Sequence, residues 1–131
     1  MKSNLLKYIV LLFLTSFFSC QKDSETISVL IIGKWDWVNS VSPWTGQVSN
    51  PQTAGFSMIL EFTVDGNLRE FRNDTFITSM NYSIEENSAN PNQYSLIYGS
   101  DLRTQICLVR DSLILNSAYV DGPVSTFIRS K

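Results

Sequence analysis

The side chains that could perform chemistry in this chain are two cysteines and twelve carboxylates, and the chain has no histidine. The absence of histidine excludes imidazole acid–base catalysis and histidine metal sites. The carboxylates are scattered, several of them at turn positions such as Asp65, Asp101 and Asp121, and Glu85 and Glu86 form a pair at a strand end. A glycosidase-like pair of carboxylates is the one catalytic arrangement that stays open. We therefore expect a protein that is not an enzyme and that has no metal and no cofactor.

The first cysteine, Cys20, follows a segment with the layout of a secretory signal. A basic start with two lysines precedes an apolar run from Tyr8 to Phe18, and the small residue Ser19 stands just before the cysteine. The run is shorter than the ~20 residues of a membrane-spanning helix. The four residues that end at Cys20, Phe-Phe-Ser-Cys, resemble a bacterial lipobox, which implies cleavage before the cysteine and a diacylglyceryl group on its thiol. We predict a lipoprotein signal peptide at 1–19 and lipidation of Cys20; an ordinary signal peptide, with Cys20 as a free or paired thiol, is the alternative.

The second cysteine, Cys107, lies in the apolar segment Gln105–Val109, which has the character of a strand. A cysteine in such a segment is usually a small buried hydrophobic residue. If Cys20 carries lipid, Cys107 has no disulfide partner. We therefore expect Cys107 to be buried and to have no catalytic or metal-binding role.

Charge and composition favour attachment to a membrane through lipid chains. Cleavage before Cys20 removes two lysines and leaves eight basic and twelve acidic side chains, a net charge of about −4. This charge argues against nucleic acid as a partner, because nucleic acid requires a basic face. A multiply acylated anchor holds a protein at the membrane without such a face. Residues 20–26 form the lipidated cysteine and a polar tether, whose acidic side chains resemble sorting tags for the outer face of the outer membrane. We expect a cell-envelope protein, lipid-anchored to the outer membrane and either periplasmic or surface-exposed.

Residues 27–131 are predicted to form one all-β domain. Apolar and polar residues alternate with the period of two that is typical of strands, and Asp65-Gly66 is a strong hairpin signal because glycine accepts the positive φ of a tight turn. Residues 27–32 fit a single helical turn or the start of a strand, and the Pro- and Gly-rich residues 43–55 fit a long loop. Short strands with frequent turns indicate an eight-stranded up-and-down antiparallel β-barrel, which has no exposed edge. The expected strands are 34–41, 57–64, 68–73, 76–85, 94–98, 104–109, 112–116 and 124–129.

The domain resembles the lipocalin-like domains of small bacterial lipoproteins over residues 27–131. The resemblance rests on Gly33-Lys34-Trp35 at the start of the first strand, on the strand–turn–strand segment 59–68, and on the closing Phe127-Ile128-Arg129. It implies that Trp35 closes one end of the barrel and that Arg129 lies across it, where a guanidinium over an indole face gains roughly 0.5–2 kcal/mol. Gly33, Trp35 and Arg129 are therefore the residues expected to close the barrel.

The barrel interior is the first candidate site. The alternation places apolar and polar side chains on the inward faces of the strands, as an apolar cup with a polar handle at Tyr82 or Asn39. Such a cup suits a lipid, a pigment or another small apolar molecule. The alternative is a filled barrel in which these residues are core, because eight strands leave room for packing or for one small ligand. The expected binding residues are Trp37, Asn39, Met58, Leu60, Phe62, Met80 and Tyr82.

A second candidate site is the loop that carries Trp44. The segment Pro43-Trp44-Thr45-Gly46 puts an aromatic ring in a polar loop, and exposed aromatic side chains often mark contact surfaces. The loop predicts contact with an envelope protein or a glycan; the alternative is that Trp44 packs back over the barrel mouth. The two functions that follow are a small-molecule binder and a non-enzymatic contact module with a filled barrel.

Overall fold

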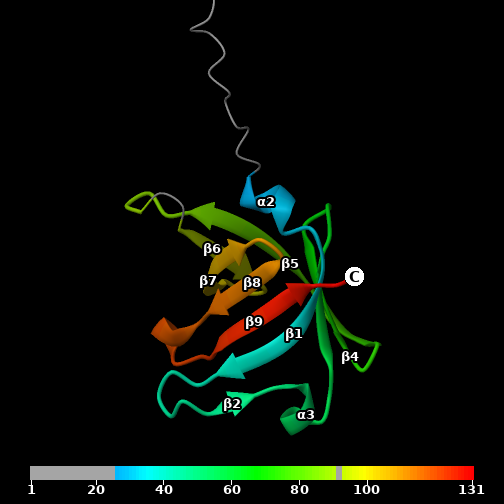
Figure 1. The fold of residues 1–131 in the computed structure, drawn as a ribbon. Coiled ribbons are helices and arrows are strands. Elements are labelled where there is room, and N and C mark those ends of the chain that lie inside the picture. Colours follow the sequence, from blue (N-terminus) through cyan, green and yellow to red (C-terminus); the bar gives the residue numbers. More distant parts are fainter. Residues whose placement is uncertain (1–25, 91–92) are drawn as a thin grey trace, which may run out of the picture.

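The computed structural model describes residues 26–90 and 93–131, which form a closed eight-stranded antiparallel β-barrel (Figure 1). Neighbouring strands in the sheet are neighbours in the chain, and β1 pairs with both β3 and β9, which closes the barrel. The predicted fold class is confirmed. The barrel strands are β1 (Gly33–Val41), β3 (Met58–Phe62), β4 (Asn67–Arg72), β5 (Thr75–Glu86), β6 (Tyr94–Tyr98), β7 (Leu102–Val109), β8 (Ser112–Asn116) and β9 (Val124–Arg129).

The predicted signal peptide, Cys20 and the tether up to residue 25 lie outside the described residues. Every barrel strand and every member of the buried apolar core lies between Ile27 and Arg129. This segment therefore holds the buried core and eight barrel strands that each have two neighbours, which is what a domain needs to fold by itself. No helix in the described part of the chain is long and apolar enough to cross a membrane.

Four short elements connect or cover the strands. Residues 27–30 form a single helical turn. The expected loop 43–55 contains a two-residue strand that extends the sheet beside the end of β1, and then a turn of helix. That helix has a capping box between Asn50 and Thr53, Pro51 in its first turn, and Gly55 in the left-handed conformation at its end. The elements are α2 (Ile27–Leu30), β2 (Val48–Ser49), α3 (Pro51–Ala54) and η2 (Ala118–Val120).

Tight turns of the expected chemistry join the strands. Gly66 between β3 and β4 has a φ of 84°, and Asn73 and Asp74 between β4 and β5 have φ values of 46° and 63°. Two successive positive φ values are the requirement of a type I′ hairpin, which matches the twist of the strands that it joins. The turns thereby fix the register of the β3–β4–β5 meander that carries much of the barrel wall.

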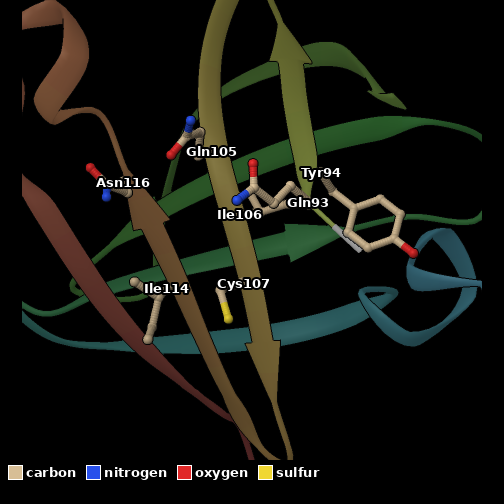
Figure 2. A pocket seen from close by; sticks show the side chains of 7 residues that line it. All are labelled: Gln93, Tyr94, Gln105, Ile106, Cys107, Ile114 and Asn116. Atoms are coloured by element: carbon tan, nitrogen blue, oxygen red, sulfur yellow. The ribbon is translucent and has the colours of Figure 1, made fainter. Parts of the chain in front are cut away.

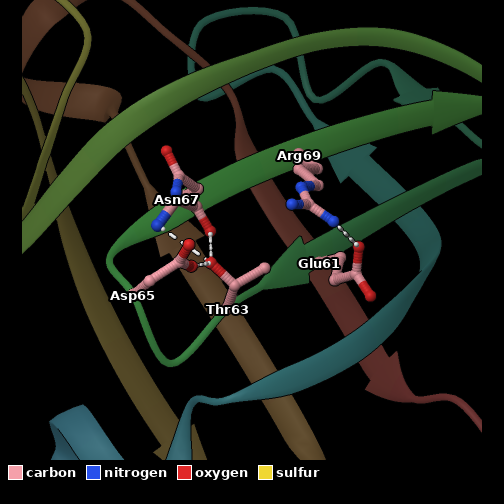
Figure 3. A network of polar contacts seen from close by, with 5 residues as sticks. All are labelled: Glu61, Thr63, Asp65, Asn67 and Arg69. Atoms are coloured by element: carbon pink, nitrogen blue, oxygen red, sulfur yellow. Dashed lines mark hydrogen bonds and ion pairs between the residues drawn. The ribbon is translucent and has the colours of Figure 1, made fainter.

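The β3–β4 turn is held by a polar cluster that Figure 3 shows. The Thr63 hydroxyl donates a hydrogen bond to the Asp65 carboxylate, and Asn67 also bonds that carboxylate. These bonds favour the ionised form, so the pKa of Asp65 lies below its ordinary value of 3.8. On the adjacent strands, Arg69 lies 3.6 Å from Glu61 in an exposed ion pair.

We expect Asp65→Asn to lower stability at neutral pH and to lose this effect in acid. A carboxyl whose folded pKa is depressed stabilises the fold above its unfolded pKa, and this contribution disappears as the pH falls through the folded pKa. Urea midpoints of the wild type and of Asp65→Asn, compared at neutral pH and at steps below about pH 3.9, check this. Thr63→Ser keeps the hydroxyl and should behave as the wild type. A gap between Asp65→Asn and the wild type that stays constant with pH would contradict the assignment.

A bulge in β1 changes the face on which its later residues lie. Trp37 pairs with the buried Phe127, but the next pair is Asn39 with Thr126, so Val38 is the extra residue. Residues alternate in face along β9, and residues directly opposite each other share a face, so Asn39 lies on the outer face of the barrel. The expectation that Asn39 shares the inward face of Trp37 is therefore wrong.

The same alternation places Cys107 outside the barrel. The flanking residues Thr104 and Ile106 of β7 are buried, with exposed fractions of 1% and 5%, and Cys107 is exposed. The expectation of a buried Cys107 is therefore wrong, because its apolar neighbours in the sequence belong partly to the opposite face of the strand.

Candidate ligand cavity

One end of the barrel is closed by α2 together with the first residues of β1. Ile31, which ends α2, and Trp35 are fully buried, and the Trp35 indole N–H donates a 2.7 Å hydrogen bond to the Ile31 carbonyl oxygen. This bond satisfies the one polar atom of a large buried ring, so the ring can serve as core. The helical turn of α2 lies over this end of the barrel (Figure 1).

Arg129 crosses this closed end from the last strand. Its guanidinium carbon lies 4.2 Å from the centre of the Trp35 ring, and its two terminal nitrogens donate hydrogen bonds to the carbonyl oxygens of Leu30 (2.7 Å) and Ile32 (3.2 Å). Gly33 has a φ of 128°, and a Cβ there would lie 3.1 Å from an Arg129 terminal nitrogen. The structure therefore brings Gly33, Trp35 and Arg129 together, and the glycine leaves room for the arginine.

A cavity of about 200 Å³ lies inside the barrel, and none of the closing residues Ile31, Trp35 and Arg129 lines it. Its walls come from six strands, and the lining is apolar apart from one carboxylate and one phenol. Carbon and sulfur atoms of leucine, methionine and phenylalanine side chains form most of its surface. The lining residues are Met58, Leu60, Leu68, Glu70, Met80, Leu96, Tyr98, Leu115 and Phe127.

The expected binding residues divide between this cavity and the rest of the barrel. Met58, Leu60 and Met80 line the cavity. Phe62 is 1% exposed and packs edge-on against Tyr82, with ring centres 5.1 Å apart. These two rings therefore fill the barrel on the side of the closed end, so the interior is part core and part cavity.

Tyr82 stabilises the β3–β4 turn and does not line the cavity. Its hydroxyl donates a 3.1 Å hydrogen bond to the Thr63 carbonyl oxygen. Burial raises the pKa of Tyr82 above its ordinary value, and the nearby Asp65 charge raises it further. The hydroxyl therefore keeps its proton near neutral pH and continues to donate.

Trp37 belongs to the rim of the cavity end. Its ring stacks on Phe56 with centres 5.7 Å apart, and the Arg72 guanidinium carbon lies 4.8 Å from the centre of the Phe56 ring. The Trp37 indole N–H donates to the Ser40 hydroxyl, which lies 2.7 Å from the Ser125 hydroxyl. Arginine, phenylalanine and tryptophan side chains thus form a column, and hydrogen bonds across β1 and β9 hold the tryptophan end of it.

Glu70 and Tyr98 are the polar cavity residues that the sequence reasoning missed. Glu70 alternates in phase with the buried Leu68 of β4, and Tyr98 alternates in phase with the buried Leu96 of β6. The period of two that indicated Met58 and Leu60 would therefore have found them. Burial raises the pKa of Tyr98 above its ordinary value, with a further contribution from Tyr119, so its hydroxyl is neutral near pH 7.

A second hollow, of about 270 Å³, lies beside β7 and β8 (Figure 2). The register pairs Cys107 with Ile114 and Gln105 with Asn116, so these four side chains share the outer face of the sheet. Gln93, Tyr94 and Ile106 complete its lining. The lining offers one thiol, one phenol and three amides, and none of these lining residues is an acid or a base of the Asp, Glu, Lys or Arg type.

Trp44 projects from the β1–β2 loop into solvent, with an exposed fraction of 73%. It does not pack over the barrel mouth. A third hollow, of about 300 Å³, separates this loop from the loop before β9, and its lining is mostly polar. The lining residues are Ser40, Ser42, Pro43, Gln47, Ser49, Asp121, Gly122 and Pro123.

No protein-family model, no curated protein and no solved structure matches this chain.

Proposed function

We propose that this chain is a cell-envelope lipoprotein, anchored to the outer membrane through a lipid on Cys20, whose lipocalin-like barrel binds a small apolar molecule. The observation that carries the binding proposal is the cavity of about 200 Å³ bounded by Met58, Leu60 and Met80 inside the closed barrel. An apolar cavity of ~150 Å³ in a protein core is large enough to hold benzene. The space therefore suits a ligand whose apolar part is one ring or a short alkyl chain.

The position of the proposed anchor is compatible with access to the cavity. The described chain starts at Thr26, just before α2 on the closed end (Figure 1), and none of the closing residues Ile31, Trp35 and Arg129 lines the cavity. Five residues separate Cys20 from Thr26, and the six residue steps between the two span at most about 20 Å. The anchor would thus hold the closed end near the membrane and leave the mouth free.

We propose a binding protein and not an enzyme. No group of three or more Cys, Asp or Glu side chains that could hold a metal gathers within the described residues. Glu70 is the one carboxylate of the cavity lining. It accepts a 2.7 Å hydrogen bond from Arg72 Nε. A glycosidase-like reaction requires two carboxylates across one cleft.

Native mass spectrometry of residues 21–131, purified from the host envelope, tests the binding proposal. We expect a reproducible additional mass of one small molecule. Leu115→Phe fills the cavity and should remove this mass, because Leu115 lines the cavity and an added ring leaves no space for a ligand. Leu102→Phe, at an exposed position, is the matched control and should retain it. A bare protein mass from several independent extracts would count against a carried ligand.

The second candidate function is contact with an envelope protein or a glycan. It is favoured by the exposed Trp44 ring and by the polar hollow beside its loop. Tyr119 and Val120, in the β8–β9 connection at the same end of the barrel, are also exposed. A bare protein mass in the experiment above would favour this contact function over small-molecule binding.

A further inference from the structure

Glu70 is the one charged side chain among the residues that line the described cavity. It lies opposite Leu60 on β3 and Thr78 on β5, which places it on the inward face of β4. Its side chain is 21% exposed, so it is largely removed from bulk water. A partly buried carboxylate in an apolar wall is a strong acceptor, and it favours a ligand group that donates hydrogen bonds or carries positive charge.

Arg72 occupies only part of the hydrogen-bonding capacity of the Glu70 carboxylate. Its Nε donates one hydrogen bond of 2.7 Å to Glu70 Oε1, whereas an ionised carboxylate offers about four acceptor sites. The Arg72 guanidinium is turned toward the Phe56 ring and is 47% exposed, and Arg72 is not part of the cavity lining. The carboxylate of the pair thus faces the cavity, and the cation of the pair faces the rim.

We infer that the barrel ligand is a small amphiphile whose protonated amine lies against Glu70 and whose apolar body lies among the methionine and leucine side chains of the cavity. This inference rests on the proposed function of the barrel. An anionic ligand is disfavoured because its carboxylate would share the cavity with Glu70. A neutral hydroxyl can bond Glu70 as a donor, but it lacks the charge that makes such bonds strong. The Tyr98 hydroxyl in the same wall can accept a further hydrogen bond from the amine.

The chain provides its own reporters for a test. Residues 21–131 contain two methionines, Met58 and Met80, and both line the cavity. Selective ¹³C labelling of methionine methyl groups therefore gives NMR signals that report directly on cavity occupancy. We would titrate residues 21–131 with three probes that share one aromatic ring: 2-phenylethylamine, 2-phenylethanol and 3-phenylpropionate.

We expect 2-phenylethylamine to bind the wild type about tenfold more tightly than 2-phenylethanol, with 3-phenylpropionate the weakest, because a hydrogen bond with a charged donor exceeds a neutral one. Glu70→Gln keeps the shape of the side chain and removes its charge. The affinity of this variant for the amine should therefore fall to about its affinity for the alcohol. Arg72→Gln is the matched control from the other half of the ion pair. It removes a competing cation, so the preference for the amine should be kept or increased.

The outcomes separate this inference from the function on which it rests. Equal binding of amine and alcohol to the wild type, or an amine preference that survives Glu70→Gln, would overturn the inference and leave small-molecule binding intact. If no probe moves either methionine signal, and the envelope-purified protein also has a bare mass, both proposals are wrong. The methionine and tryptophan signals of the free variants show whether each one is folded.

Discussion

Replacement of Trp35 by alanine is expected to lower the free energy of unfolding by about 3–5 kcal/mol. Trp35 is fully buried, its indole N–H bonds the Ile31 carbonyl oxygen, and its ring carries the Arg129 guanidinium. Alanine would leave a cavity the size of an indole and would orphan both partners. Small domains have total stabilities of roughly 5–15 kcal/mol, so this loss would leave the barrel marginal.

The three tryptophans of the chain form a graded set for this measurement. Trp37 is 7% exposed and stacks on one ring at the rim, whereas Trp44 is 73% exposed. We expect the loss for Trp37→Ala to be smaller than that for Trp35→Ala, and the change for Trp44→Ala to stay within about 0.5 kcal/mol. Urea unfolding followed by far-ultraviolet circular dichroism gives all three values without depending on tryptophan emission. If Trp35→Ala were as stable as Trp44→Ala, Trp35 would not be the centre of the closed end.

The strands were predictable because the barrel repeats one simple pattern. Burial alternates along the wall strands, as the buried Leu60 and Phe62 of β3 show, and positive-φ turns such as Asn73-Asp74 separate the strands. Period and turn chemistry are local properties that a sequence displays directly. The helix α3 could also have been predicted, because Asn50 and Thr53 form a capping box and Gly55 stands just past the end. It was missed because it is short and lies within a loop sequence.

The cavity was only partly predictable, because alternation gives the face of a residue and not its height in the barrel. Met58 and Phe62 share the inward face of β3, yet Met58 lines the cavity and Phe62 fills the closed half. The stagger of neighbouring strands decides between these positions, and this depends on all the pairings at once. A bulge adds a second uncertainty, because one extra residue at Val38 moved Asn39 to the outer face.

Replacement of Arg129 is the second change for which we expect a large effect, about 2–3 kcal/mol for Arg129→Ala. The guanidinium makes two charge-assisted hydrogen bonds to backbone carbonyls at the end of α2, and such bonds contribute about 1.5–3 kcal/mol. We reduce the sum of the two because the side chain is 35% exposed and water can replace part of each bond. The ion pair with Asp111 adds little, since the atoms are 3.8 Å apart and Asp111 is 86% exposed.

Arg129→Lys should recover little of this loss, and that result would show that geometry matters here beyond charge. A lysine ammonium is a point charge on a flexible stem, so it cannot both stack flat on Trp35 and donate to the carbonyl oxygens of Leu30 and Ile32. We expect faster hydrogen exchange at the amides of residues 29–32 in Arg129→Lys, as α2 loosens from the barrel end. Arg103→Lys is the matched control, because Arg103 forms an exposed ion pair with Glu85 and its replacement should leave both stability and exchange unchanged. If Arg129→Lys had wild-type stability and exchange, the closed end would need only a positive charge, and the forked contacts of the arginine would not be what holds α2 in place.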